Sequence, residues 1–122
     1  MKTFSIDKKE LNPVISKPEL YKRRILLTET ANPNRKYPCE VDEHVEVGRS
    51  RSADICIPHD IAIGRHHCYF YFQQDVLFAR DLGSINHTFV NGHRLRKEDG
   101  AMVIHDGDIL LLGNTKFKVS IF

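Results

Sequence analysis

The sequence predicts an antiparallel β-sandwich, and three observations support this fold class. Apolar and polar residues alternate with a period of two through most of the chain after residue 22, as expected of strands with one buried and one wet face. Turn-forming pairs such as Asn91-Gly92 separate these runs. No window of about eleven residues carries a helical period. About ten or eleven short strands divided by turns are typical of a sandwich, whose end loops remain available for recognition.

The predicted strands follow one another to the end of the sequence. The first is ILLTE, and the segment ETANPNRKYP after it has the composition of a loop. The later runs are HVEV, ICI, a hairpin of HHCYFYFQ and VLFARDL, then TFV, HRLR, AMVI, DILLLG and TKFKVSIF. Alternation in the last run predicts a buried face of Phe117, Val119 and Ile121, and its lysines would discourage pairing between copies if it were an edge strand. We expect residues 1–21 to be an extension or linker and residues 22–122 to be the domain.

Composition excludes several classes of function. The 122 residues carry 18 Lys+Arg against 16 Asp+Glu, which gives a net charge of +2 with both signs interleaved, whereas a nucleic-acid binder more often has a basic face. No apolar run approaches the ~18 residues of a membrane span, and the N-terminus lacks the apolar core of a signal peptide. A cytoplasmic protein is therefore predicted. Three unpaired cysteines, Cys39, Cys56 and Cys68, are expected to be buried free thiols.

Gly48-Arg49-Ser50 is the first segment with the chemistry of a binding site. A glycine at a strand end lets another backbone approach closely, and an arginine at a loop mouth presents a planar fork that matches a phosphate. Alone, this short motif is a weak signal, because an arginine at the end of a strand is more often simply solvated.

The wider context makes the signal specific. VEVGRS, GRHH, DLGSINHTFVNG and DGDILLLGNTKFKV occur in this order with suitable spacing, and together they resemble the signature of the forkhead-associated (FHA) domain from about residue 24 to 122. The resemblance implies an eleven-stranded β-sandwich that binds phosphothreonine peptides through loops at one end. Arg49 would contact the phosphate, and Asn86 would hydrogen-bond the peptide backbone. The resemblance gives architectural roles to Gly48, His67, Asn91 and Gly92.

The sequence departs from the family pattern at three positions of this site. Gly64 replaces a serine that grips the phosphate, and Ile85 replaces a residue that is often Ser or Thr. Each lost charged hydrogen bond weakens binding by roughly ten- to a hundredfold. Ser50 or Arg65 could supply replacement donors, and the Gly64 N–H remains. His87 replaces a glycine where unusual backbone angles are expected, and its imidazole is hypothesised to add a pH-dependent charge.

Metal binding and catalysis have less support. His59, His66 and His87 are predicted on neighbouring loops, but they lack the close spacing of a metal site. A triad of Asp81, His67 and Ser84 can be written on paper, yet Ser84 lacks a nucleophile elbow. The acids Asp106 and Asp108 flank a turn, where aspartate is common for backbone reasons. We therefore predict no enzyme activity, no metal and no cofactor.

Two functions remain open from the sequence. One is a phosphothreonine-binding interaction module in Ser/Thr kinase signalling, with a phosphorylated protein as partner and no nucleic acid, membrane or small-molecule substrate. The alternative is a divergent FHA scaffold that binds a protein partner independently of phosphorylation. Gly64 and Ile85 favour the second function, whereas Arg49 and Asn86 favour the first.

Overall fold

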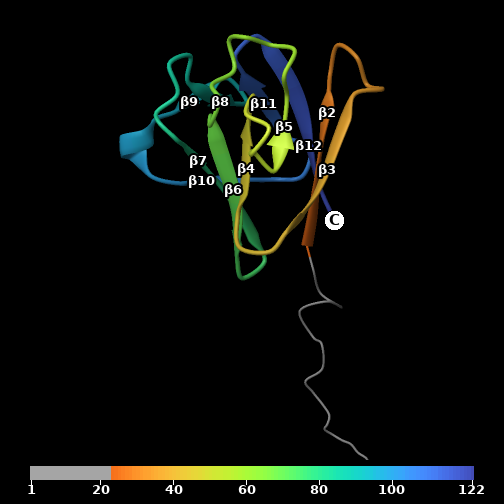
Figure 1. The fold of residues 1–122 in the computed structure, drawn as a ribbon. Coiled ribbons are helices and arrows are strands. Elements are labelled where there is room, and N and C mark those ends of the chain that lie inside the picture. Colours follow the sequence, from red (N-terminus) through yellow and green to blue (C-terminus); the bar gives the residue numbers. More distant parts are fainter. Residues whose placement is uncertain (1–22) are drawn as a thin grey trace, which may run out of the picture.

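The computed structural model describes residues 23–122, and eleven strands within them form two packed sheets (Figure 1). The predicted extension at residues 1–21 lies outside the described residues. In chain order the strands are β2 (Arg23–Glu29), β3 (Lys36–Val41), β4 (Val45–Gly48), β5 (Ile55–Cys56), β6 (Cys68–Gln73), β7 (Val76–Asp81), β8 (Thr88–Val90), β9 (His93–Leu95), β10 (Met102–Ile104), β11 (Ile109–Leu112) and β12 (Thr115–Ile121).

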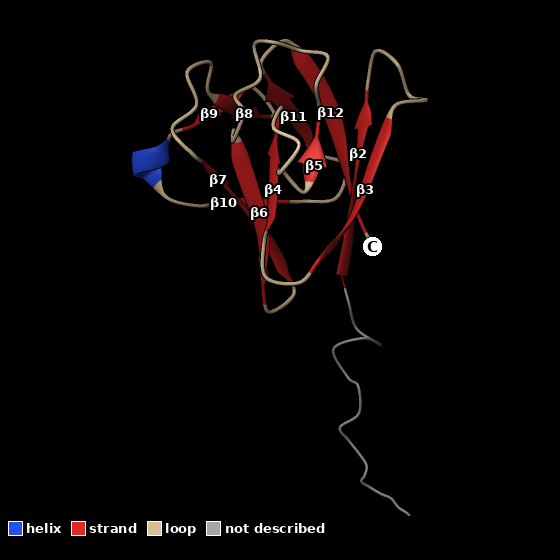
Figure 2. Cartoon of the chain, viewed as in Figure 1, coloured by secondary structure: helices blue, strands red, loops and turns tan. Residues whose placement is uncertain are grey.

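The two sheets confirm the predicted β-sandwich. One sheet has the order β10-β7-β6-β4-β5, and the other has the order β3-β2-β12-β11-β8-β9. All strand pairs are antiparallel except β4 with β5, which run parallel. The described part of the chain contains a single short 3₁₀ turn, η1 (Lys97–Asp99), and no other helix (Figure 2). No helix in residues 23–122 has the length and apolar character needed to cross a membrane.

The core lies between the sheets, where the inward residues of both layers meet. Alternation in β12 leaves Phe117 and Val119 fully buried, as predicted, whereas Ile121 on the same face is only half-buried. Burial of each such side chain stabilises the fold by roughly 1.5–3 kcal/mol. The largest fully buried side chains are Phe70, Phe117, Ile25, Leu27, Ile57, Ile63, Leu77, Leu95, Leu110 and Leu112.

One strand assignment differs from the sequence prediction, and the sheet order decides whether the last strand lies at an edge, which the sequence left open. Lys36–Pro38 belongs to β3 rather than to a loop. Pro38 is tolerated because β3 is an edge strand, so the missing N–H breaks no ladder on the outer side. β12 lies inside its sheet, between β2 and β11. Its lysines therefore do not protect an edge.

The turns follow the sequence signals closely. Asn91 and Gly92 both have positive φ, at 51° and 83°, which is the geometry of the tight hairpin turn that Asn-Gly favours. The β6–β7 hairpin turns at Gln74, whose φ is 58°.

The three cysteines are free, but only Cys68 is fully buried, while Cys39 and Cys56 are half-buried. Burial raises the pKa of the Cys68 thiol.

Candidate recognition site at the loop end

Gly48, at the end of β4, allows two loops of the site, residues 49–54 and residues 57–67, to touch. A Cβ atom there would lie 2.1 Å from the carbonyl oxygen of Arg65 and 2.6 Å from its carbonyl carbon. The backbones are joined beside it, because the Arg49 N–H donates to Gly64 O at 3.0 Å and the Ser50 N–H donates to Arg65 O at 3.1 Å. Gly48 therefore lies where a side chain would collide with the backbone of the neighbouring loop.

Arg49 is half-buried and fixed by a single side-chain hydrogen bond. Its Nε donates to the carbonyl oxygen of Ile63 at 2.6 Å. No described residue accepts a hydrogen bond from its two terminal nitrogens. A guanidinium has five N–H donors, so four remain for a ligand at the loop mouth.

His67 is completely buried, and its ring links the 57–67 loop to a third loop, residues 82–87 between β7 and β8, as a clamp. Its Nδ1 accepts the Gly64 N–H at 2.9 Å, and its Nε2 donates to the carbonyl oxygen of His87 at 2.8 Å. This pair of bonds requires the neutral ring with the proton on Nε2. Burial lowers the pKa of His67, although the hydrogen bond to His87 opposes that effect. The clamp occupies the N–H of Gly64, which the sequence had left as one conceivable compensation for the missing serine.

Asn86 also connects the third loop, residues 82–87, to the 57–67 loop. Its Nδ2 donates to the carbonyl oxygen of Ala62 at 2.8 Å. His87 has a φ of 68°, so it adopts the unusual backbone angles predicted for this position. Its ring lies edge-on to Phe89, with centroids 6.4 Å apart. Ile85 is 89% exposed, so the third loop presents an apolar side chain to solvent.

The two predicted replacement donors differ in availability. The Ser50 hydroxyl pairs with the Ser52 hydroxyl at 2.8 Å and accepts the Ser52 N–H, so it serves its own turn. Arg65 is exposed, and Arg51 is exposed on the neighbouring loop. These two side chains add positive charge to the end of the sandwich that carries Arg49.

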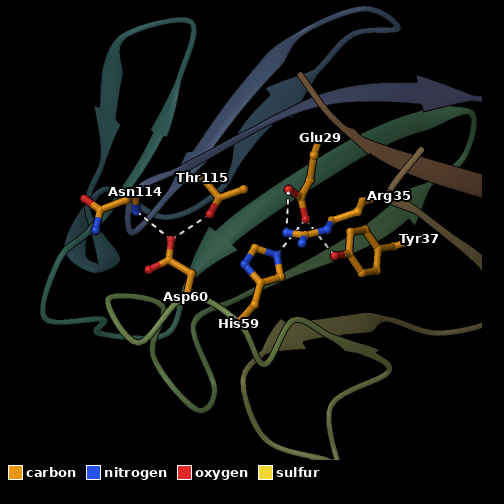
Figure 3. Close-up of polar contacts among 7 residues, drawn as sticks. All are labelled: Glu29, Arg35, Tyr37, His59, Asp60, Asn114 and Thr115. Atoms are coloured by element: carbon orange, nitrogen blue, oxygen red, sulfur yellow. Dashed lines mark hydrogen bonds and ion pairs between the residues drawn. The ribbon is translucent and has the colours of Figure 1, made fainter. Parts of the chain in front are cut away.

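Asp60 anchors the 60–65 loop to the other sheet (Figure 3). This buried carboxylate accepts the N–H of Ala62 at 2.9 Å, the N–H of Asn114 at 2.8 Å and the hydroxyl of Thr115 at 2.7 Å. Burial alone would raise the pKa of Asp60, but these hydrogen bonds outweigh it and lower the pKa. The loop that supplies carbonyl groups to Arg49 and Asn86 is thereby held against the start of β12.

Glu29 holds the same loop through His59, the residue before Asp60 (Figure 3). Its buried carboxylate accepts hydrogen bonds from Tyr37 Oη at 2.7 Å and His59 Nε2 at 2.7 Å, and it forms an ion pair with the Arg35 guanidinium at 3.6 Å. Burial would raise the pKa of Glu29, but the bonds from Tyr37 and His59 lower it overall. Burial and the hydrogen bond to Glu29 raise the pKa of Tyr37 to about 12.

Asp81 performs the same task for the third loop. Its carboxylate accepts the N–H groups of Gly83 and Ser84, the Ser84 hydroxyl at 2.6 Å and the Thr88 hydroxyl at 2.7 Å. Burial would raise its pKa, but these bonds lower it. Both ring nitrogens of His67 are bonded to backbone groups, so His67 makes no triad with Asp81 and Ser84.

The remaining candidate side chains are separate from one another. His59 contacts Glu29, and His66 contacts Glu46 through Nδ1. Residues 23–122 contain no group of three or more His, Cys, Asp or Glu side chains placed to hold a metal ion. Asp106 accepts the N–H of Ile121, and Asp108 accepts the N–H of His105. These two acids have the backbone role predicted for them.

Sequence reasoning did not identify the buried carboxylates that hold the loops. Asp81 is followed by Gly83 and Ser84, and this pattern of an aspartate before turn residues is a local signal that could have identified it. Asp60 and Glu29 act across long stretches of chain, since the Asp60 bond to Thr115 spans 55 positions. No local pattern predicts a pairing of that kind.

Comparison with known proteins agrees with this geometry. The family model for the FHA domain matches residues 45–113. The ABC transporter ATP-binding/permease protein Rv1747 of Mycobacterium tuberculosis is 41% identical over 70 residues, which are 57% of this chain and only 8% of that protein. The chain therefore spans less than a tenth of that relative's length.

Two solved structures show how similar the fold is. Mycobacterium tuberculosis EmbR in complex with a low-affinity phosphopeptide has a TM-score of 0.69 and 25% identity, covering 80% of this chain and 24% of that chain. The FhaA FHA domain complexed with the intracellular domain of Rv3910 has a TM-score of 0.67 and 25% identity, covering 78% of this chain and 98% of that chain. The matched residues contain Gly48, Arg49, His67 and Asn86, and this chain belongs to the FHA domain family.

Proposed function

We propose that this protein binds phosphothreonine-containing segments of a protein partner in Ser/Thr kinase signalling. The FHA domain is a protein-interaction module, and similar structures contain a phosphopeptide or a partner domain. The observation that carries the proposal is the state of Arg49. It is half-buried, oriented through Nε, and without an acceptor among the described residues for its terminal nitrogens.

The loop arrangement explains how such a segment would be held. The four remaining N–H groups of Arg49 would face the phosphate, and exposed Arg65 and Arg51 would attract its charge. Asn86 uses Nδ2 for Ala62, which leaves its Oδ1 to accept a peptide N–H. The neutral His67 clamp and the Asp60 anchor keep these groups in place before the ligand arrives, which reduces the entropy lost on binding.

A second candidate function is phosphorylation-independent docking by the same domain. Gly64 offers no hydroxyl, its N–H is taken by His67, and Ile85 presents an apolar side chain where the family often has a hydroxyl. These observations predict a weaker grip on phosphate than in family members that have both hydroxyls. They leave Arg49 as the principal phosphate ligand.

Calorimetry with a degenerate phosphothreonine peptide pool and its unphosphorylated twin tests the proposal. We expect binding only to the phosphorylated pool, and Arg49→Ala should abolish it while the protein stays folded. Arg51→Ala is the matched control, and it should weaken binding only a few-fold because its contribution is long-range attraction. A folded Arg49→Ala protein with unchanged affinity would remove phosphate recognition and favour the second function.

A further inference from the structure

The outer face of the six-stranded sheet carries an apolar row that ends in cations. Paired residues in adjacent strands point to the same face, and the register aligns Arg94 with Phe89, Phe89 with Leu111, and Leu111 with Lys116. In the next row Ile109 pairs with Lys118. Phe89, Ile109 and Leu111 are half-buried, while the three cations are exposed.

This face is hollowed rather than flat. A groove of about 440 Å³ is lined by Phe89, Asn91, Gly92, Ile109, Leu111 and Lys116. Its volume lies at the lower end of the roughly 300–1,000 Å³ of sites that enclose a ligand. Apolar side chains of a partner could enter it and displace water from three half-buried residues.

The charges around the groove are unbalanced. None of Arg94, Lys116 and Lys118 forms an ion pair with a carboxylate of the described residues. The nearby carboxylate of Asp108 is occupied, since it accepts the Asn91 amide at 3.0 Å and the His105 N–H at 2.8 Å. An apolar occupant with acidic residues would therefore complement both the groove and its rim.

We propose that this groove, lined by Phe89, Ile109 and Leu111 and flanked by Arg94, Lys116 and Lys118, docks an acidic amphipathic segment of a protein partner without phosphorylation. A protein segment fits better than a membrane, because the apolar side chains line a hollow and are half-buried, which leaves little apolar surface for insertion into a bilayer. A second copy of the domain fits poorly, since it would bring two basic rims together.

The groove also lies next to the loop end. The His87 ring contacts Phe89, which lines the groove. A partner could therefore engage the loops with one segment and the groove with the next. When two segments of one partner bind at the loops and at the groove, binding of the first raises the effective concentration of the second, which increases the overall affinity. Groove binding itself does not require Arg49.

Fluorescence anisotropy with unphosphorylated synthetic peptides tests the inference. One peptide set places Leu, Ile or Phe on one helical face with Asp and Glu between them, and its twin carries Asn and Gln instead. The full chain should bind the acidic set and lose affinity as salt rises, because the rim charges become screened. Arg49→Ala should bind equally well, which separates this result from the phosphopeptide assay.

Substitutions identify the surface that is used. Leu111→Asp should weaken binding at least about thirtyfold, as expected of a residue at the centre of an interface. Val103→Asp is its matched control, since Val103 is an exposed apolar residue of β10 on the other sheet, and it should leave affinity unchanged. Lys116→Glu with Lys118→Glu should cause a loss of about tenfold, whereas Lys97→Glu on η1 should not.

Four outcomes would overturn the inference. The acidic set could fail to bind, or its Asn/Gln twin could bind as tightly. Anionic phosphatidylglycerol vesicles could bind in a Leu111-dependent way while the peptides do not, which would assign the face to a membrane. Sedimentation could show a dimer that Leu111→Asp dissociates, which would assign the face to a second copy.

Discussion

Asp60→Asn should destabilise the protein because it removes the charge that anchors the site loop. The carboxylate accepts three hydrogen bonds, from Ala62, Asn114 and Thr115. Asparagine has one acceptor oxygen, so in either orientation its NH₂ group faces a donor that Asp60 now satisfies. Losing one charged bond and leaving a buried N–H opposed to an N–H costs about 2–4 kcal/mol. Tm should therefore fall by roughly 10–25 °C.

Urea unfolding monitored by circular dichroism measures this change. The m-value should stay constant while the midpoint falls, because the native and unfolded surfaces are unchanged. Asp75→Asn is the matched control, since the Asp75 side chain is 97% exposed and, within residues 23–122, pairs only with Arg23. Thr115→Val removes a single donor to Asp60 and should cost about 1 kcal/mol. A loss below about 0.5 kcal/mol for Asp60→Asn would refute the anchoring argument.

Three further predictions follow from the clamps around the site. Gly48→Ala should destabilise the fold by at least about 1–3 kcal/mol, because its Cβ would overlap a carbonyl oxygen 2.1 Å away; unchanged thermal unfolding would contradict this. Burial lowers the pKa of His67 below 6.5, so between the two pKa values the unfolded state binds a proton that the folded state does not. The stability that neutral His67 contributes is therefore complete above about pH 6.5 and is lost as the pH falls below it. Urea midpoints measured between about pH 5 and 8 should show a steeper acid decline for the wild type than for His67→Asn. Tyr37→Phe removes a donor to buried Glu29 and should cost about 1–3 kcal/mol in the same denaturation assay, whereas a stabilised variant would show that the hydroxyl is not needed.

Local sequence patterns predicted the sandwich because its strands are short and alternate. Phe117 and Val119 were assigned to the core from period alone, and both are fully buried. The Asn91-Gly92 turn was equally predictable, since its positive φ angles are those that this pair favours. The β3 strand was missed because Pro38 indicated a loop, and only the sheet order shows that β3 lies at an edge.

The sequence motifs predicted which loops adjoin at the candidate site, but not every contact between them. Arg49, Asn86 and His87 lie on adjoining loops as the motifs implied. The bonding of the Gly64 N–H to His67 could not be read from sequence, because it depends on which way a buried ring is turned. That contact changes the chemistry, since it occupies a backbone donor that the sequence had left as one conceivable compensation for the missing serine.

Residues that hold the loops say less about function than residues whose polar groups remain available to a ligand. His67, Asp60 and Asp81 each accept hydrogen bonds from backbone N–H groups of the loops, and Gly48 lets two loop backbones approach closely, so the fold needs all four whether or not phosphate is bound. Arg49 is different, because its Nε bond orients the side chain while four N–H groups remain without a described acceptor. Holding a charge half-buried and unpaired opposes folding. A bound anion would remove that cost, and this is the physical reason to test Arg49 before the residues that merely hold the loops.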